Sequence, residues 1–400
     1  MSSSFAWVDF SEEERQKMME VLYLFREREI REELGVGTVR DAFSDILFPG
    51  TSTLHTRAKY MLFLPWIYLD LERRRTSSSK MAEYSRWEEI NLINYLLDTG
   101  EEEGVIGRVA KRNLKILPSF MYWSGLGIWG IRRFNGSLHQ YFRHLDSFYY
   151  YSKNKILSDD KEIISGVSPN WDPNIVKRPK DFPKGASLEL SYQESEYLRD
   201  RIRSNCSDSL LAFLVDKTKP TDVDFIWQHP QSGMFSDEHK KIIWHARNFS
   251  GTIHGAALLY NLMLSELIKN QEWIEKYRTK IERWANDVEK RFNDIRNWDL
   301  SEFWRIVSSE NRHIPFRTIR FIEQWIQFVK EGQNLKHTKD NKYARKLIYN
   351  REVEIKRNRS RLKNPQVLKQ YGGAAGADAL GFRWSVAKRI LDDILKGLKK

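Results

Sequence analysis

A concentration of lysine and arginine near the end of the chain offers the clearest chemistry in the sequence, the neutralisation of phosphates. The formal net charge of +12 arises entirely in residues 330–400, which hold 19 basic and 7 acidic side chains, whereas residues 1–329 hold 47 of each sign. Charge confined to one segment indicates a polyanionic partner, and nucleic acid is the commonest polyanion in a cell. The predicted phosphate contacts are Arg345, Lys346, Arg351, Lys356, Arg357, Arg359, Arg361, Arg383, Lys388 and Arg389.

The apolar residues of the same segment indicate how it would be held. Leu347, Ile348, Ile355 and Leu362 repeat every seven or eight residues, which predicts a helix within 330–369 with one buried side and a cationic remainder. Such a helix contacts phosphates without reading bases. The same surface fits the acidic face of a partner protein. An anionic membrane fits less well, because an interfacial helix would carry Trp or Phe on its apolar side and this segment has neither.

A glycine-rich segment, 371–381, precedes a helical pattern, and a turn at a helix N-terminus presents free backbone N–H groups to an anion. The candidate anion-binding turn contains Gly372, Gly373 and Gly376. Its spacing is neither a Walker loop nor a dinucleotide fingerprint, since no strand precedes it and no Gly-Lys-Ser/Thr closes it. The alternative is a small-residue turn that allows close packing against a helix.

Four polar residues interrupt an apolar helical pattern in the middle of the chain, namely His245, Arg247, Asn248 and His254. A buried polar group without a partner costs about 1–3 kcal/mol, so these residues form either a hydrogen-bond network or a site. Nine residues separate the two histidines, not the four of a metal-binding helical pair, so no metal site is predicted. An enzyme centred on the two imidazoles is the third of our functional hypotheses.

Sequence motifs for catalysis are incomplete. His337-Thr-Lys339 has the His-x-Lys core of phospholipase D-type nucleases but lacks the following Asp. Glu354-Ile-Lys356 has the Glu-x-Lys of restriction-type nucleases but falls in a helical pattern rather than on a strand. The single cysteine, Cys206, excludes a disulfide framework and a cysteine-based zinc site. We therefore assign no catalytic residue, metal or cofactor and favour a non-enzymatic protein.

The elements that would position these residues are helices. Helical periodicity dominates, which predicts a mainly α multi-helix bundle with a long central helix over 236–295. Three short helices within 86–134 have the spacing of a helix-turn-helix or winged-helix unit, and unrelated amphipathic helices are the alternative. Ser191-Tyr-Gln-Glu194 is a capping box that predicts the start of another helix.

Composition suggests four consecutive segments. They are a helical region over 1–150, a proline-rich linker over 151–190, a helical bundle over 191–329 and a basic helical region over 330–400. The first ten residues lack a signal-peptide pattern, and the longest apolar run, Met61–Leu71, is about half the length of a membrane span. We therefore expect a cytoplasmic protein without a membrane segment.

Three stretches together with the opening Trp7-Val-Asp-Phe-Ser11 resemble a bacterial family of unknown function, DUF6361. The three are Phe48-Pro-Gly-Thr-Ser-Thr-Leu-His-Thr-Arg-Ala-Lys-Tyr60, Ala246-Arg-Asn-Phe-Ser-Gly-Thr-Ile-His-Gly-Ala-Ala-Leu-Leu-Tyr-Asn261, and the glycine-rich segment that ends in Gly381-Phe-Arg-Trp384. The resemblance covers nearly the full chain and implies an association with anti-phage defence loci. It carries no catalytic residues over to this sequence.

These observations lead to one favoured function and one alternative from another class. The favoured function is a non-catalytic subunit of a bacterial defence or DNA-processing system that grips phosphates, with DNA preferred over RNA as the partner. The alternative is an interaction scaffold whose basic face docks on an acidic helicase or nuclease.

Overall fold

The computed structural model describes residues 33–153, 168–309, 313–332 and 335–400, and within these ranges every regular element is a helix. This confirms the mainly α multi-helix fold. The chain forms two units that alternate along the sequence. The first unit comprises the described residues up to Phe43 together with Ile242–Phe382, and the second comprises Ser44–Lys241 and Arg383–Lys400. None of the described helices is long and apolar enough to cross a bilayer.

The first unit is a bundle around one long helix. Its helices are α2 (Gly37–Leu47), α9 (Asp237–Ile268), α10 (Gln271–Glu289), α11 (Phe292–Arg296), α12 (Leu300–Ser308), α13 (Phe316–Glu331), α14 (Lys342–Lys356) and α15 (Pro365–Leu368), with short 3-10 turns η4 (Leu335–Asp340) and η5 (Arg357–Arg359). The first two of these helices continue into residues of the second unit.

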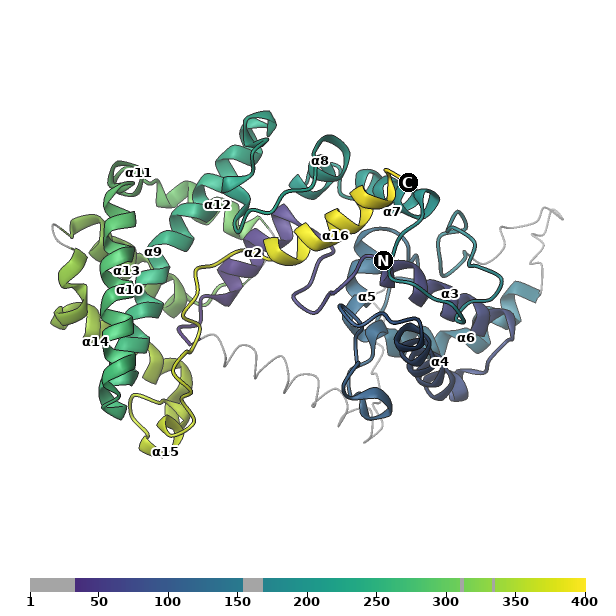
Figure 1. Ribbon diagram of the computed structural model, residues 1–400, viewed down its shortest axis with the longest axis horizontal. Coiled ribbons are helices and arrows are strands. Elements are labelled where there is room, and N and C mark those ends of the chain that lie inside the picture. The colour runs from purple at the N-terminus through teal and green to yellow at the C-terminus, as the bar shows by residue number, and fades with distance from the viewer. Residues whose placement is uncertain (1–32, 154–167, 310–312, 333–334) are drawn as a thin grey trace, which may run out of the picture. The chain divides into compact units, whose positions relative to one another are not determined.

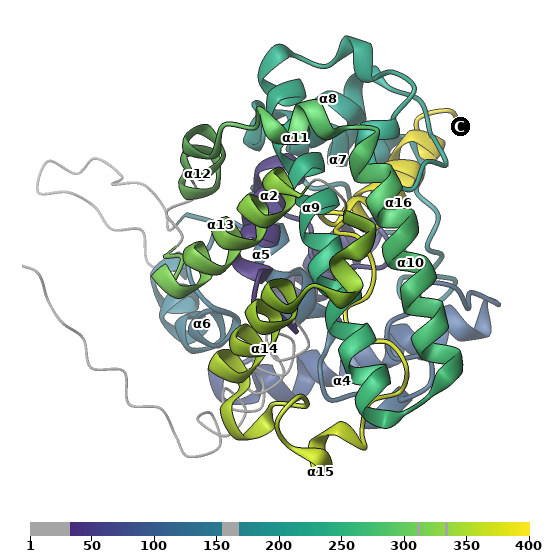
Figure 2. The ribbon, with the colours of Figure 1, turned by 90° about the vertical axis from the view of Figure 1, so that its left-hand side faces the viewer.

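Helix α9 lies in the middle of the first unit, and its neighbours are fixed by buried polar contacts (Figures 1 and 2). From α10, Trp284 Nε1 donates to the carbonyl of Gly251 at 2.7 Å, and from α13, Trp325 Nε1 donates to the carbonyl of Thr252 at 2.9 Å. On the side of α14, the Tyr260 hydroxyl lies 3.3 Å from a carboxylate oxygen of Glu352. Nineteen residues of α9 are buried, so it is a core helix on most of its circumference.

Close packing between α9 and α10 depends on Gly255. A Cβ atom at this position would lie 2.2 Å from Cζ2 of Trp284, a buried ring that its hydrogen bond to Gly251 holds in place. We expect Gly255→Ala to destabilise the first unit by about 2–3 kcal/mol, because the ring has no room to move. Urea unfolding of the full chain measures this cost. Gly381→Ala, whose Cβ would meet nothing within 4 Å, is the control; equal effects of the two substitutions would contradict the prediction.

Two helices are shorter than the sequence suggests. The continuous helix expected over 236–295 is wrong, because α9 ends before Lys269, which has a φ of +63°, and Asn270 caps a new helix by accepting from Trp273 N–H at 3.0 Å. The continuous helix expected within 330–369 is also wrong. Asn341 caps α14 through the N–H of Ala344, also at 3.0 Å, and Arg357 ends that helix with a φ of +50°.

The second unit contains the remaining helices, and α3, α4, α5 and α6 pack against one another within it (Figure 1). Its elements are α3 (Tyr60–Arg73), α4 (Ser78–Asp98), η1 (Lys111–Asn113), α5 (Pro118–Ile128), α6 (Leu138–Lys153), α7 (Tyr192–Asn205), α8 (Leu210–Lys217), η2 (Ile226–Gln228), η3 (Ser232–Met234) and α16 (Trp384–Gly397). The capping box at the start of α7 is confirmed, since Ser191 and Glu194 bond each other's backbone N–H groups.

Residues 105–117 contain turns in place of the middle helix expected within 86–134. Gly104 and Gly107 have φ values of +87° and +83°, and Lys111 has a φ of +45°. These left-handed residues interrupt any helix, so α4 and α5 are joined by a compact loop with a single 3-10 turn. The expectation of three successive helices in this segment is therefore wrong.

The described part of the proline-rich segment is built into the second unit. Trp171 is 1% exposed and Phe182 is 9% exposed, so these two side chains anchor the segment to the core of the unit, while many of its other residues are exposed. Residues 154–167 of the expected linker lie outside the described residues, as does the stretch Trp7–Ser11.

Candidate nucleic-acid interface

Helix α14 has an inward and an outward side, and the predicted phosphate contacts divide between them. Arg351 is on the inward side and is 3% exposed. Its guanidinium donates to the carbonyl of Leu34 at 2.9 Å and to the hydroxyl of Thr318 at 2.9 Å, and it lies 5.1 Å from the centre of the Phe321 ring. Burial lowers the pKa of Arg351 to about 10. Its surroundings make Arg351 a core residue.

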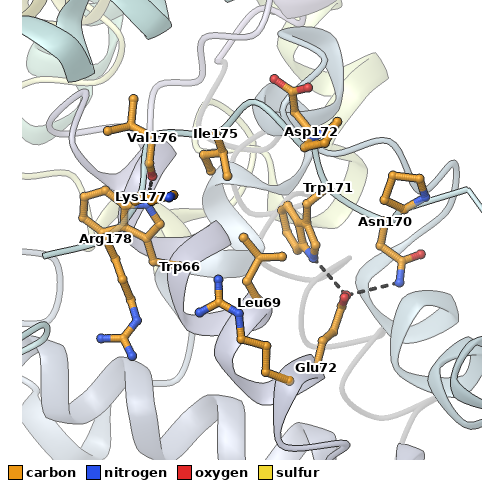
Figure 3. Close-up of a pocket in the computed structure, with 13 residues that line it drawn as sticks. Trp66, Leu69, Glu72, Asn170, Trp171, Asp172, Ile175, Val176, Lys177 and Arg178 are labelled. Carbon is orange, nitrogen blue, oxygen red and sulfur yellow. Dashed lines mark hydrogen bonds between the residues drawn. The ribbon is translucent and has the colours of Figure 1, made fainter. Parts of the chain in front are cut away.

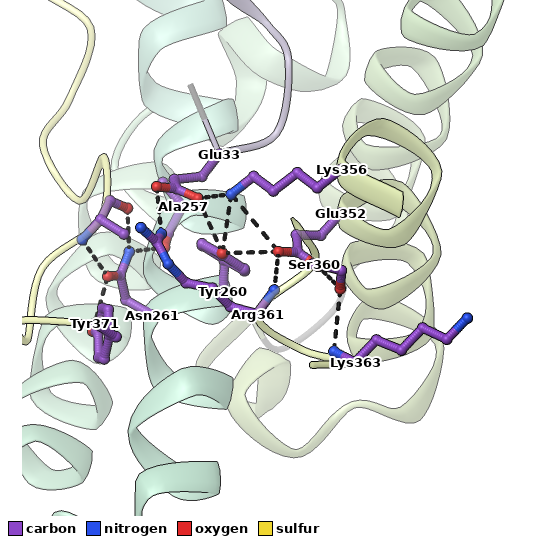
Figure 4. A network of polar contacts seen from close by, with 11 residues as sticks. Glu33, Ala257, Tyr260, Asn261, Glu352, Lys356, Ser360, Arg361, Lys363 and Tyr371 are labelled. Atoms are coloured by element: carbon purple, nitrogen blue, oxygen red, sulfur yellow. Dashed lines mark hydrogen bonds and ion pairs between the residues drawn. The ribbon is translucent and has the colours of Figure 1, made fainter. Parts of the chain in front are cut away.

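Lys356 also points inward, into a network of buried charges (Figure 4). Its ammonium forms an ion pair with Glu33 and lies 3.7 Å from the carboxylate of Glu352. Arg361 reaches the other oxygen of Glu33 at 2.6 Å, and the Tyr260 hydroxyl donates to Glu33 at 3.0 Å. The two carboxylates thus meet two cations, and the network neutralises itself inside the first unit.

Glu352 shapes the turn that follows α14. Its carboxylate accepts from the hydroxyl of Ser360 and, at 2.8 Å, from the backbone N–H of Arg361 (Figure 4). Ser360 Oγ in turn accepts from the N–H of Lys363 at 3.1 Å. One buried carboxylate therefore fixes the backbone on the C-terminal side of η5.

Three further predicted contacts have acidic partners in the structure. Arg345 pairs with Glu266. In the second unit, Arg383 pairs with Asp45 and Lys388 lies 3.0 Å from Asp222. Arg389 is exposed and donates to the carbonyl of Thr56 at 3.4 Å.

The outward side of α14 and η5 carries the predicted contacts that have no such partner. Lys346, Arg357 and Arg359 are exposed and form no ion pair with any other described residue. Two tyrosines that the charge pattern did not reveal join them, since Tyr343 is 53% exposed and Tyr349 is 40% exposed. Lys342 completes this surface, which we call the outer basic face. It consists of Lys342, Tyr343, Lys346, Tyr349, Arg357 and Arg359.

Helical geometry brings four of these residues together. Lys342, Tyr343, Lys346 and Tyr349 lie within about 120° of one another around the axis of α14, whereas Arg357 and Arg359 follow the end of this helix and belong to the turn η5. The sequence from Ile355 to Ala377 contains no acidic residue, and the carboxylate just before it, that of Glu354, pairs with Arg320 and Arg351.

The glycine-rich segment lies along α9 and is held mainly through its carbonyl groups. Ser250 Oγ donates to the carbonyl of Leu380 at 2.9 Å, and His254 Nε2 donates to the carbonyl of Ala377 at 3.1 Å. Asn261 bonds both backbone groups of Ala375, each at 2.8 Å. The segment therefore packs closely against a helix, as expected if its small residues serve packing and not anion binding.

The three glycines of the predicted anion-binding turn differ in their surroundings. Gly372 and Gly376 are exposed. Gly373 is buried, and its carbonyl accepts from the Tyr277 hydroxyl at 2.7 Å. A Cβ atom added at this position would lie only 2.7 Å from the ring of Trp273. Close packing accounts for Gly373, and two residues, Phe382 and Arg383, intervene between the segment and α16.

The polar residues of α9 do not converge on one point. His245 Nδ1 accepts from Trp298 Nε1 at 2.9 Å, whereas His254 bonds the glycine-rich segment, and the two positions lie nine residues, about 13.5 Å along the helix axis, apart. Burial lowers the pKa of His254. Asn248 accepts from Arg291, and Arg247 is exposed. Within the described ranges, no group of three or more His, Cys, Asp or Glu is placed to hold a metal ion.

A pocket of about 260 Å³ lies in the second unit between α3 and residues 169–178 (Figure 3). Trp66 and Trp171 line it together with Glu72. The Oε1 atom of Glu72 accepts from Tyr141 at 2.5 Å, Asn170 at 3.1 Å and Trp171 at 3.0 Å. Burial raises the pKa of Glu72. The carboxylate of Glu72 thus links α3 to Tyr141 of α6 and to residues 169–178 on the other side of the pocket.

The stretch Phe48–Tyr60 connects several elements of the second unit. His55 bonds the carbonyl of Met121 at 3.0 Å, and the hydroxyl of Thr56 donates to the carbonyl of Gly104 at 2.6 Å. Arg57 pairs with the carboxylate of Asp393 at 2.9 Å, and Lys59 pairs with that of Glu194 at 2.5 Å. The stretch therefore links several elements of the second unit through polar contacts.

Comparison with known sequences identifies the family of the chain. A family described as a family of unknown function, DUF6361, matches residues 1–397, so the chain belongs to it. No curated protein and no solved structure matches the chain.

Proposed function

We propose that this protein binds nucleic acid through the outer basic face, with DNA preferred over RNA, as a non-catalytic subunit of a bacterial defence or DNA-processing system. The observation that carries the proposal is the separation of charge across α14. On its inward side Lys356 is neutralised by buried carboxylates and Arg351 is held by backbone carbonyls and Glu354, whereas Lys346, Arg357 and Arg359 are exposed without a described acidic partner. The defence setting comes from the family resemblance.

Phosphate is the ligand that this arrangement suits best. Cations without a described acidic partner are carried here by the backbone of α14 and η5, so they can release the counterions of a phosphate backbone without first ordering the protein backbone. The buried side of α14 and the bonds from Glu352 supply this rigidity. Phosphate contacts of this kind set affinity and register but do not read sequence.

Charge reversal of the outer basic face tests the proposal. We expect the triple variant Lys346→Glu, Arg357→Glu and Arg359→Glu to lower affinity for labelled DNA by at least a hundredfold at about 50 mM salt, because binding that rests on phosphate contacts is electrostatic. Fluorescence anisotropy over a salt series measures both the affinity and its salt dependence. Arg361 is left unchanged, since it pairs with Glu33.

The matched control makes the same change in net charge on residues of the second unit, outside the outer basic face. Lys80, Lys115 and Lys184 are exposed residues of the second unit, and the variant with all three changed to Glu should bind DNA within about threefold of the original protein. Equal losses in the two triple variants would show that net charge alone attracts DNA. Binding that survives reversal of the outer basic face, or that does not weaken as salt rises, would overturn the proposal.

An acidic helicase or nuclease would meet the same cations, and this is the alternative function. Co-purification distinguishes the two, because a complex with a protein partner survives nuclease treatment. Loss of that complex in the outer-face variant, with no DNA binding by the original protein, would assign the face to the protein partner.

A further inference from the structure

We infer that the outer basic face binds single-stranded nucleic acid in preference to duplex, with bases stacked on Tyr343 and Tyr349. The inference rests on the proposed function and adds its substrate class. It is carried by two exposed aromatic rings set among unpaired cations, a combination that a purely phosphate-binding surface does not need.

The two rings are exposed, as Phe316 of the same unit is, but they alone of these three lie on the outer basic face. Tyr343 is 53% exposed and Tyr349 is 40% exposed, whereas Tyr260 and Tyr277 of the same unit are fully buried. Large rings are normally buried because leaving their apolar surface in water is unfavourable. The ring of Tyr343 also has a neighbour within the unit, since its centre lies 6.1 Å from that of the Phe328 ring. Its remaining surface is available to a flat partner.

The two rings flank the central cation of the face. Tyr343 and Tyr349 lie three residues before and three residues after Lys346. On an α-helix this places them about 60° to either side of the lysine and about 9 Å apart along the axis. A strand that crosses the helix with its phosphates near Lys346 and Lys342 therefore has an aromatic ring on each side of its path.

Stacking on these rings requires unpaired bases. A base in a single strand presents its π-face to a tyrosine, and such stacking is worth a factor of about five to a hundred in affinity per base. In a duplex the faces of the bases are already stacked on one another, so the tyrosine rings have no free base face to stack on. The cations can contact the phosphates of single-stranded and duplex nucleic acid alike, whereas the tyrosines can stack only on the bases of a single strand.

The experiment compares two ligands on the full chain. A fluorescent oligothymidine of about 20 nucleotides and a duplex of the same length are titrated at several salt concentrations. We expect the Tyr343→Ala, Tyr349→Ala double variant to lose at least tenfold in affinity for the single strand and less than threefold for the duplex. The salt dependence should stay unchanged, because stacking releases no counterions. The Tyr343→Phe, Tyr349→Phe variant keeps both rings and should bind as the original protein does.

The outcomes distinguish nucleic-acid binding itself from the preference for a single strand. If the original protein binds neither ligand, the proposed function fails. If it binds duplex as tightly as single strand and the alanine variant binds both normally, the single-strand inference is overturned while nucleic-acid binding stands. A loss of affinity in the phenylalanine variant equal to that in the alanine variant would also overturn stacking, since the ring would then not be the group that matters.

Discussion

Lys356→Met is expected to destabilise the first unit by about 3–5 kcal/mol, which is the cost of leaving a buried charge without its partner. Glu352 is fully buried and Glu33 is 8% exposed, and Lys356 is the cation that they share. Methionine fills a similar volume but carries no charge. Glu33 keeps Arg361 as a partner, so the larger part of the loss falls on Glu352.

A double-mutant cycle makes this expectation specific. Glu352→Gln removes the second charge, and we expect the Lys356→Met, Glu352→Gln variant to lose about 1–3 kcal/mol less than the sum of the two single losses. Lys346→Met on the exposed side of α14 is the control and should change stability by no more than about 0.5 kcal/mol. Urea unfolding, with hydrogen exchange of α14 to locate the effect, measures all four variants. A cost below about 1 kcal/mol for Lys356→Met would show that water solvates the network.

The same network explains why the sequence predicted the basic segment only in part. Counting charges correctly located a cationic helix, and the apolar repeat correctly indicated that one side is buried. Neither pattern distinguishes an inward lysine from an outward one. The partner of Lys356 is Glu33, which lies 323 residues away in the sequence, so its position follows only from the tertiary fold. Arg351 was misassigned for the same reason, because its acceptor at Leu34 is equally remote.

Helix content was predictable, whereas helix ends were less so. Periodicity over many residues indicated α9, α10 and α14, and the capping box at Ser191 marked the start of α7. The break between α9 and α10 depends on two residues, Lys269 and Asn270, within a pattern that otherwise continues. A single asparagine that caps a helix through its side chain leaves almost no trace in an average over a dozen positions.

The stretches that carry the family resemblance are explained by packing. Ser250, His254 and Asn261 lie along one side of α9 and bind the glycine-rich segment, so two of the three stretches contact each other. From the sequence, His254 was one of four polar residues expected to form either a hydrogen-bond network or a site. In the structure its imidazole bonds the carbonyl of Ala377, which is the contact expected of a network.

Two buried groups of the second unit give its stability opposite dependences on pH. Burial lowers the pKa of His55 to about 4, although its bond to the carbonyl of Met121 acts in the other direction. Burial raises the pKa of Glu89 to about 7, against the effect of its bonds from Ser119 and Tyr68. The histidine is therefore neutral in the folded state over most of the acidic range, and the glutamate is protonated there.

The sign of each contribution follows from proton binding. Between pH 6.5 and 4 the unfolded chain binds a proton at His55 that the folded unit excludes, so stability falls as the pH falls, by about 3 kcal/mol in total. Between pH 4.5 and 7 the folded unit keeps a proton on Glu89 that the unfolded chain has released, so stability falls as the pH rises, by about the same amount. Within pH 4.5–6.5 the two contributions nearly cancel.

Conservative substitutions separate the two groups. Glu89→Gln leaves only the histidine, and His55→Gln leaves only the glutamate, so between pH 5 and 6 the stabilities of the two variants should diverge by about 2.7 kcal/mol per pH unit, twice the value of 1.36 for one proton. Other carboxylates titrate in this range too, but both variants share them and they cancel in the difference. Urea unfolding across this range, with hydrogen exchange of α3 and α5 to report on the second unit, measures the divergence. Parallel pH profiles would contradict the prediction, because they would mean that neither group changes its proton affinity on folding.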